Sequence, residues 1–106
     1  MIIATTEELP GKRIQESFGL VRGNAVRARH LGKDIGAAIK GIVGGEITEY
    51  TKLMGEVREQ ALDRMCKEAR ARGANAVVAL RFANTEIAAG AAEILAYGTA
   101  VRVEEE

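Results

Sequence analysis

Two segments near the C-terminal end of the sequence have the pattern of strands whose two faces are both apolar. An antiparallel sheet with one face in water alternates apolar and polar residues instead. Segment 76–83 places Val78, Leu80 and Phe82 on one face and Val77, Ala79 and Arg81 on the other. Segment 92–103 places Leu95, Tyr97, Thr99, Val101 and Val103 opposite Ile94, Ala96, Gly98 and Ala100. Both faces of the predicted sheet therefore need cover.

One long helix is predicted from Thr48 to Arg72. Its apolar side chains share one stripe, formed by Tyr50, Met54, Val57, Ala61, Met65 and Ala69. Arg70 suits the negative end of the helix dipole, and Gly73 stands where a left-handed C-cap residue is expected. Because a single helix covers only one face of a sheet, the second face needs residues 30–44 or another subunit. An uncovered patch several strands wide is unusual on a monomer, so the sequence predicts a homo-oligomer.

The N-terminal part of the chain carries weaker signals. Residues 1–4 are a short apolar run that ends before the chain's only proline, which predicts a strand followed by a turn. Residues 12–29 have an extended pattern with Gly19 and Gly23 inside it, which predicts a bulged or bent strand, or two strands. In residues 30–44, glycines interrupt a helical spacing, so we expect a short weak helix or an ordered loop.

Length and composition fit a single domain over residues 1–106. Lys and Arg together number 15 and balance 15 Asp and Glu, so no net field attracts nucleic acid or a membrane surface. The acidic end, residues 104–106, is interpreted as a solvated tail. Cys66 is the only cysteine, which suits a reducing compartment. The first residues are too polar for a signal sequence or a membrane span, so we expect a cytoplasmic protein.

The stretch GIVGGEITEYTKL places a glycine pair at the start of the predicted helix. A phosphate-binding loop would add a Lys or Arg at this point. Glu46 and Glu49 stand there instead, and carboxylates both satisfy the helix dipole and repel an anion. We therefore interpret the junction as a turn, with Thr48 or Thr51 as the N-cap of the helix.

Four stretches in a fixed order cover most of the chain: GGEITEYTKL, Arg64-Met65, GANAVVALRF and AAEILAYGTAV. In this order and spacing the chain resembles the YbjQ-like family of small uncharacterised proteins. The resemblance implies an α+β, dodecin-like subunit of β-α-β-β order, with the helix packed on an antiparallel sheet. It also implies assembly into a ring-shaped homopentamer. The family is described as heavy-metal-binding, and it provides no established catalytic residues to carry over to this sequence.

The sequence contains no ligand pair for a heavy metal. Soft metals prefer thiolates and imidazoles, and zinc sites contain short units with two such ligands. This chain has one cysteine, Cys66, in mid-helix beside Met65, where we expect a small buried hydrophobe, and one histidine, His30, at a basic strand end. A ring could still bring together five copies of His30 or of Glu46 at its axis. No catalytic residue is assigned, since His30 is the only neutral-pH base and no GxSxG motif is present.

Two side chains in the strands bear on ligand binding. Tyr97 is predicted either to pack in the core or to line a pocket between subunits. Arg81, in an otherwise apolar strand, needs a partner, for which an intersubunit carboxylate is expected.

The sequence therefore favours a non-enzymatic, cytoplasmic homo-oligomer that binds a small ligand or a metal ion at subunit interfaces, with the cofactor and the metal-ligating residues unknown. A structural or protein-interaction assembly without a ligand is the alternative. An enzyme with an active site at a subunit interface is the third interpretation. An enzyme would contain a cluster of groups with perturbed pKa values in an interface pocket.

Overall fold

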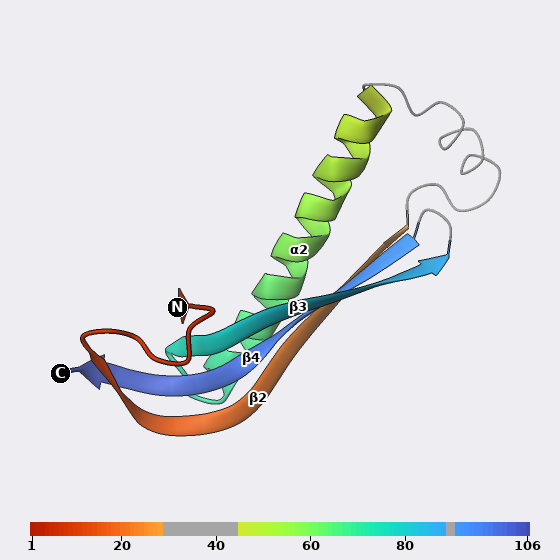
Figure 1. Cartoon of the computed structure of the whole chain (residues 1–106). Coiled ribbons are helices and arrows are strands. Elements are labelled where there is room, and N and C mark those ends of the chain that lie inside the picture. Colours follow the sequence, from red (N-terminus) through yellow and green to blue (C-terminus); the bar gives the residue numbers. More distant parts are fainter. Residues whose placement is uncertain (29–44, 89–90) are drawn as a thin grey trace.

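The computed structural model of this chain describes residues 1–28, 45–88 and 91–106, and their side chains over 1–26, 51–85 and 91–106. These residues form one long helix and a four-stranded sheet (Figure 1). The elements in chain order are β1 (Ile2–Ile3), β2 (Lys12–Ala28), α2 (Gly45–Ala71), β3 (Ala76–Ala88) and β4 (Ala91–Glu105).

The sheet has the strand order β1-β3-β4-β2. Strand β4 pairs antiparallel with both β2 and β3, as the sequence predicts for the β-α-β-β core. Strand β1 pairs parallel with β3, through Ile2 opposite Ala76 and Ile3 opposite Val77. The fold is therefore α+β with a mixed sheet, because the short N-terminal strand adds one parallel pair to the predicted antiparallel sheet.

Strand β2 is one long curved strand. Its register against β4 shifts between Ile14 and Glu16 and again between Ser17 and Gly19, and Gly19 has a φ of 85°. Such bulges bend a strand and increase its twist, and the curve of β2 is visible in Figure 1. The prediction of a bulged strand is confirmed, and its alternative of two separate strands is wrong.

Strand β3 contains a bulge that the sequence pattern did not reveal. Ala79 has a φ of 55°, which is left-handed and unfavourable for a residue with a Cβ, and the register against β4 shifts between Val78 and Arg81. The bulge places Leu80 in the same core cluster as Val77, while Val78 lies in the cluster on the other side of the sheet. The predicted face shared by Val78 and Leu80 is therefore wrong, because strict alternation fails across a bulge.

The main core lies between α2 and the sheet. The predicted stripe is confirmed for Val57, Ala61, Met65 and Ala69, which have no exposed surface. These residues pack against side chains of β2, β3 and β4: Val21, Ala25, Val77, Leu80, Ile94, Ala96 and Ala100. The side chain of Tyr50, the first residue of the predicted stripe, lies outside the described residues.

The helix ends as the sequence predicts and begins earlier than expected. At its C-terminus Gly73 has a φ of 95°, its N–H donates to the Arg70 carbonyl, and the Ala74 N–H donates to the Ala69 carbonyl. This pair of bonds is a Schellman motif, for which glycine is the preferred left-handed residue. At the other end α2 already includes Gly45, so neither Thr48 nor Thr51 is its N-cap.

A second, smaller core lies on the face of the sheet opposite α2. It contains Ala76, Val78, Val101 and Val103, with Leu9 from the N-terminal segment packed over them. This segment therefore covers one end of the second face. Residues 30–44, one of the two predicted covers, lie outside the described residues.

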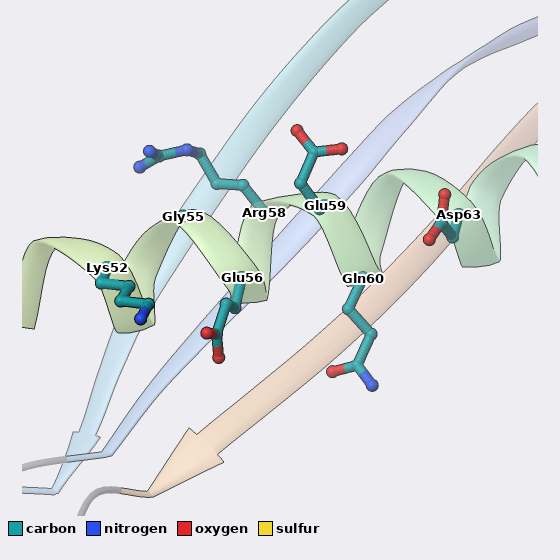
Figure 2. A pocket seen from close by; sticks show the side chains of 7 residues that line it. All are labelled: Lys52, Gly55, Glu56, Arg58, Glu59, Gln60 and Asp63. Atoms are coloured by element: carbon teal, nitrogen blue, oxygen red, sulfur yellow. The ribbon is translucent and has the colours of Figure 1, made fainter.

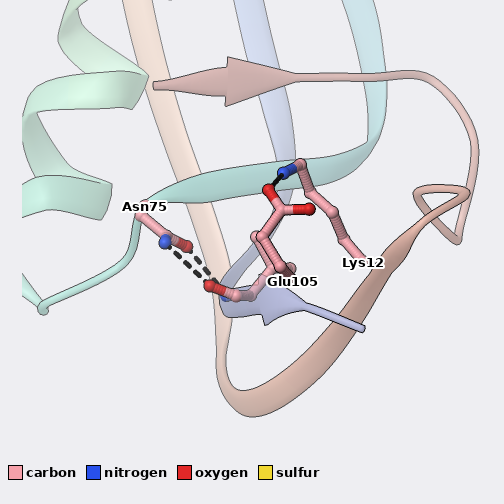
Figure 3. Close-up of polar contacts among 4 residues, drawn as sticks. Lys12, Asn75 and Glu105 are labelled. Carbon is pink, nitrogen blue, oxygen red and sulfur yellow. Dashed lines mark hydrogen bonds and ion pairs between the residues drawn. The ribbon is translucent and has the colours of Figure 1, made fainter.

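The acidic end of the chain belongs to the sheet. Glu104 and Glu105 lie in β4 and form ion pairs with Arg13 and Lys12 directly opposite them on β2. Figure 3 shows the pair of Lys12 and Glu105. The prediction of a tail is wrong for Glu104 and Glu105, because complementary charges on the facing strand extend the pairing, whereas Glu105 and Glu106 are exposed to solvent as predicted.

The side chain of Asn75 continues the β3 pairing along β4. Its Nδ2 donates to the Val103 carbonyl at 2.9 Å, and its Oδ1 accepts the Val103 N–H at 2.8 Å (Figure 3). The amide group thus replaces one backbone unit of a strand and fixes the start of β3 beside the end of β4.

Candidate functional site

The most distinctive polar group of the sheet lies on the face opposite α2. Val21, Gly23 and Ala25 of β2 are buried and face the helix, so the residues between them face the other way. Tyr97 of β4 is directly opposite Arg22 of β2 and directly opposite Arg81 of β3. Because paired residues project to the same side, the three side chains form one row across three strands.

Apolar and polar side chains both adjoin this row. Leu20 is 55% exposed and Val26 is 51% exposed, both on β2, and Leu95 on β4 is half-buried. Asn24 is opposite Leu95, and its Nδ2 donates at 3.5 Å to Glu93, which is opposite Val26. We call the surface formed by Leu20, Arg22, Asn24, Val26, Arg81, Glu93, Leu95 and Tyr97 the open face. It adjoins the small core under Leu9, which is the covered part of the same side of the sheet.

The guanidinium of Arg81 is held in place by backbone carbonyls. Its Nη1 donates to the Thr5 oxygen at 3.0 Å and to the Leu80 oxygen at 2.7 Å. Within the described residues, neither Arg22 nor Arg81 has a carboxylate at ion-pair distance. Two exposed arginines therefore flank Tyr97 at the centre of the open face, where guanidinium groups suit an anion, and the carboxylate of Glu93 lies further along the same face, opposite Val26.

Tyr97 was one of the residues singled out by the sequence. It is half-buried and lies on the open face, so it is not part of the core between sheet and helix. Arg22, Leu20 and Val26 were not singled out as site residues. The sequence shows only that they occupy alternate positions of one extended segment, so that they share one face of a strand. Their alignment with Tyr97 depends on pairing with residues about 75 positions away along the chain.

The outer surface of α2 forms a second, shallow hollow (Figure 2). It is lined by Lys52, Gly55, Glu56, Arg58, Glu59, Gln60 and Asp63. In Figure 2, Glu56 and Gln60 point to one side of the helix while Arg58 and Glu59 point to the other. Charges of both signs alternate there and do not converge, which is typical of a solvated helix face.

The described residues do not fit a heavy-metal site within one chain. No group of three or more His, Cys, Asp or Glu side chains that could hold a metal ion occurs among them. Cys66 is 5% exposed and belongs to the main core, as expected for a small buried hydrophobe. His30 lies outside the described residues, and so does the side chain of Glu46, which is in the first turn of α2.

Burial raises the pKa of the Cys66 thiol above its ordinary value of 9.0, against the opposing effect of Arg70 and with a smaller contribution from Asp63. The thiol is therefore protonated at neutral pH, and a protonated thiol is a poor nucleophile and a poor metal ligand.

The buried thiol should show in the pH dependence of stability. A thiol whose pKa is higher in the folded state stabilises the fold below its unfolded-state pKa and loses that contribution as the pH rises through the folded-state value. We therefore expect the free energy of unfolding of the natural chain to fall more steeply above about pH 9 than that of Cys66→Ala. Urea unfolding at pH 7 to 10.5 measures this difference, and identical slopes for the two proteins would contradict the burial of the thiol.

The family of the chain follows from comparison with known proteins. A family model described as "Putative heavy-metal-binding" matches residues 1–104. The chain belongs to this YbjQ family. A UPF0145 protein of Clostridioides difficile (strain 630) is 52% identical over 106 residues, which are all of this chain and 95% of the relative. A UPF0145 protein of Thermotoga maritima is 55% identical over 104 residues, or 98% of each chain.

A solved structure supports the fold of this YbjQ family member. The crystal structure of a protein of unknown function from Pediococcus pentosaceus matches with a TM-score of 0.67 over 98% of both chains. The two sequences are 15% identical, so this likeness concerns the fold alone. No helix among the described residues is long and apolar enough to cross a membrane.

Proposed function

We propose that this YbjQ family member is a cytoplasmic homo-oligomer, a ring-shaped pentamer, whose subunit interfaces bind a small anionic ligand at the open face. The observation that carries the proposal is the open face itself. It combines exposed Leu20 and Val26 with two arginines that flank Tyr97, on the side of the sheet opposite the core formed with α2. Apolar walls with a few convergent polar groups are typical of small-molecule sites.

The charges of the open face favour an anion over a metal ion. Guanidinium groups bind carboxylate and phosphate oxygens with two parallel hydrogen bonds, and the fixed position of Arg81 lowers the entropy lost on binding. A cation at the same position would be repelled by Arg22 and Arg81. A metal ion would need ligands from several copies of the chain, for which His30 and Glu46 are the sequence candidates.

Native mass spectrometry of protein purified without a metal-affinity tag tests this proposal. We expect a closed ring carrying a bound organic mass in fixed ratio to the subunits, unchanged after treatment with a chelator. Arg22→Ala should lower the occupancy of that ligand at least about tenfold, since a charge-assisted hydrogen bond contributes about 1.5–3 kcal/mol. A bare ring would instead support a structural or interaction role. A monomer would contradict the proposal.

A further inference from the structure

The N-terminal segment, residues 1–11, binds the bulge of β3 along the outer edge of that strand. Ala79 has the left-handed φ of 55°, and its N–H donates to the Thr6 carbonyl at 2.8 Å. The N–H of the next residue, Leu80, donates to the Ala4 carbonyl at 3.0 Å. In a regular strand, successive N–H groups point to opposite edges. The segment therefore binds the irregular backbone of the bulge and offsets part of its strain.

The carbonyl between these two acceptors holds the side chain of Arg81. Arg81 Nη1 donates to the Thr5 carbonyl at 3.0 Å and to the Leu80 carbonyl at 2.7 Å. Because Nη1 carries two hydrogens, these bonds use both of them. Within the part of the chain that the structure describes, Nε and Nη2 of Arg81 make no hydrogen bond. The guanidinium is therefore fixed at one end, and its Nε and Nη2 donors remain for another partner.

The remaining donors of Arg81 match a carboxylate. Nε and Nη2 form one edge of the planar guanidinium, and a carboxylate accepts two parallel hydrogen bonds from such an edge. Arg81 is directly opposite Tyr97, whose ring provides an aromatic surface for the organic part of a ligand. A lysine at this position would provide a point charge without the paired geometry. The arrangement therefore favours an organic acid with an aromatic or apolar body.

We propose that the carbonyls of residues 4–6 position Arg81 to bind the carboxylate of such an organic acid at the open face. This inference rests on the proposed function, and it adds the chemical group that is bound and the segment that positions its partner. The entropy lost in ordering the Arg81 side chain is lost once for both contacts, so the ligand and the docked segment stabilise each other. By linkage, a bound ligand reduces the local opening of the N-terminal segment.

Hydrogen exchange of the full chain with added benzoate tests this coupling. Benzoate is a planar aromatic carboxylate, and benzamide is its neutral counterpart of similar shape. The Ala79 and Leu80 amides require opening of the N-terminal segment to exchange, because its carbonyls accept both. A ligand that binds only the closed state slows exchange by the factor 1 + [L]/Kd, or about tenfold at ten times its Kd. We expect at least about a threefold slowing with benzoate and less than about twofold with benzamide.

Arg81→Lys tests the guanidinium itself, with Arg102→Lys as the matched control. Arg102 is exposed near the C-terminal end of β4 and donates to the Gly73 carbonyl at 3.3 Å, outside the open face. We expect the Kd for benzoate, measured by NMR titration, to rise at least about tenfold for Arg81→Lys, because a lysine cannot form the two parallel hydrogen bonds. Arg102→Lys should keep this Kd within about twofold of the natural value.

The outcomes separate this inference from the proposed function. Benzoate binding that Arg81→Lys does not weaken would overturn the role of Arg81. Binding without slower exchange at Ala79 and Leu80 would overturn the positioning role of the N-terminal segment, and this measurement uses the natural chain, so it does not depend on the folding of a variant. A ring that carries an organic mass but binds no benzoate would overturn the carboxylate assignment alone. A chain with neither a bound organic mass nor affinity for benzoate would overturn the proposed function as well.

Discussion

Gly23→Ala is expected to lower the free energy of unfolding by at least about 3 kcal/mol, because overpacking against rigid atoms is severe. A Cβ at position 23 would lie 2.2 Å from the Ala61 oxygen and 2.4 Å from the Met65 nitrogen. Both atoms belong to the backbone of α2, so no side-chain rotation relieves the contact. Urea unfolding followed by circular dichroism measures the change, and loss of soluble folded protein would be the extreme form of the same result.

Gly55→Ala is the matched control for this prediction. Gly55 lies within α2, and a Cβ there would meet only the Arg58 Nη2 atom, at 3.8 Å. Alanine is favoured over glycine in a helix by about 0.8–1 kcal/mol, so this variant should be stabilised by about that amount. Equal stability of Gly23→Ala and the natural chain would show that α2 does not approach β2 as closely as described here.

The close contact at Gly23 connects the fold to the proposed assembly. It brings the backbone of α2 against β2, and from this position Arg64 and Arg72 reach the outward carbonyls of that strand. The same helix therefore packs the core and covers the middle of the β2 edge. Within the described residues, the first part of β2 and the distal half of β3 have no strand paired to their outer edge.

Local periodicity predicted the elements of the fold well. The buried stripe of α2 and its glycine C-cap depend on residues within one or two helical turns, and both are confirmed. The apolar character of both faces of β3 and β4 is also confirmed, because Val77 and Val78 are both buried although they lie in separate cores. These features follow from side-chain direction within one element.

Features that depend on pairing between distant segments were not predictable in the same way. The row of Arg22, Tyr97 and Arg81 requires the registers of two strand pairs, which the sequence pattern leaves open. The bulge at Ala79 changes which residues share a face, and no glycine marks it. For the same reason, the sequence pattern did not predict that Glu104 and Glu105 form ion pairs with β2 as part of a strand.

Val101→Asp is the second change for which we expect a large effect. Val101 is 1% exposed and packs with Val78 and Val103 beneath Leu9, on the side of the sheet opposite the helix. An aspartate there would bury a charge, and no cation in the described part of this cluster could pair with it. We expect a loss of at least about 3 kcal/mol in the free energy of unfolding, measured by urea denaturation at pH 7.

Leu20→Asp on the same side of the sheet separates folding from assembly. Leu20 is 55% exposed, so this change should alter the stability of the subunit itself by less than about 1 kcal/mol. If a neighbouring copy covers the open face, the same aspartate is buried on association and the assembly should dissociate at concentrations where the natural chain remains assembled. If Leu20→Asp were folded and fully assembled, the open face would lie outside the interface. If Val101→Asp were folded and as stable as the natural chain, the second core would be contradicted.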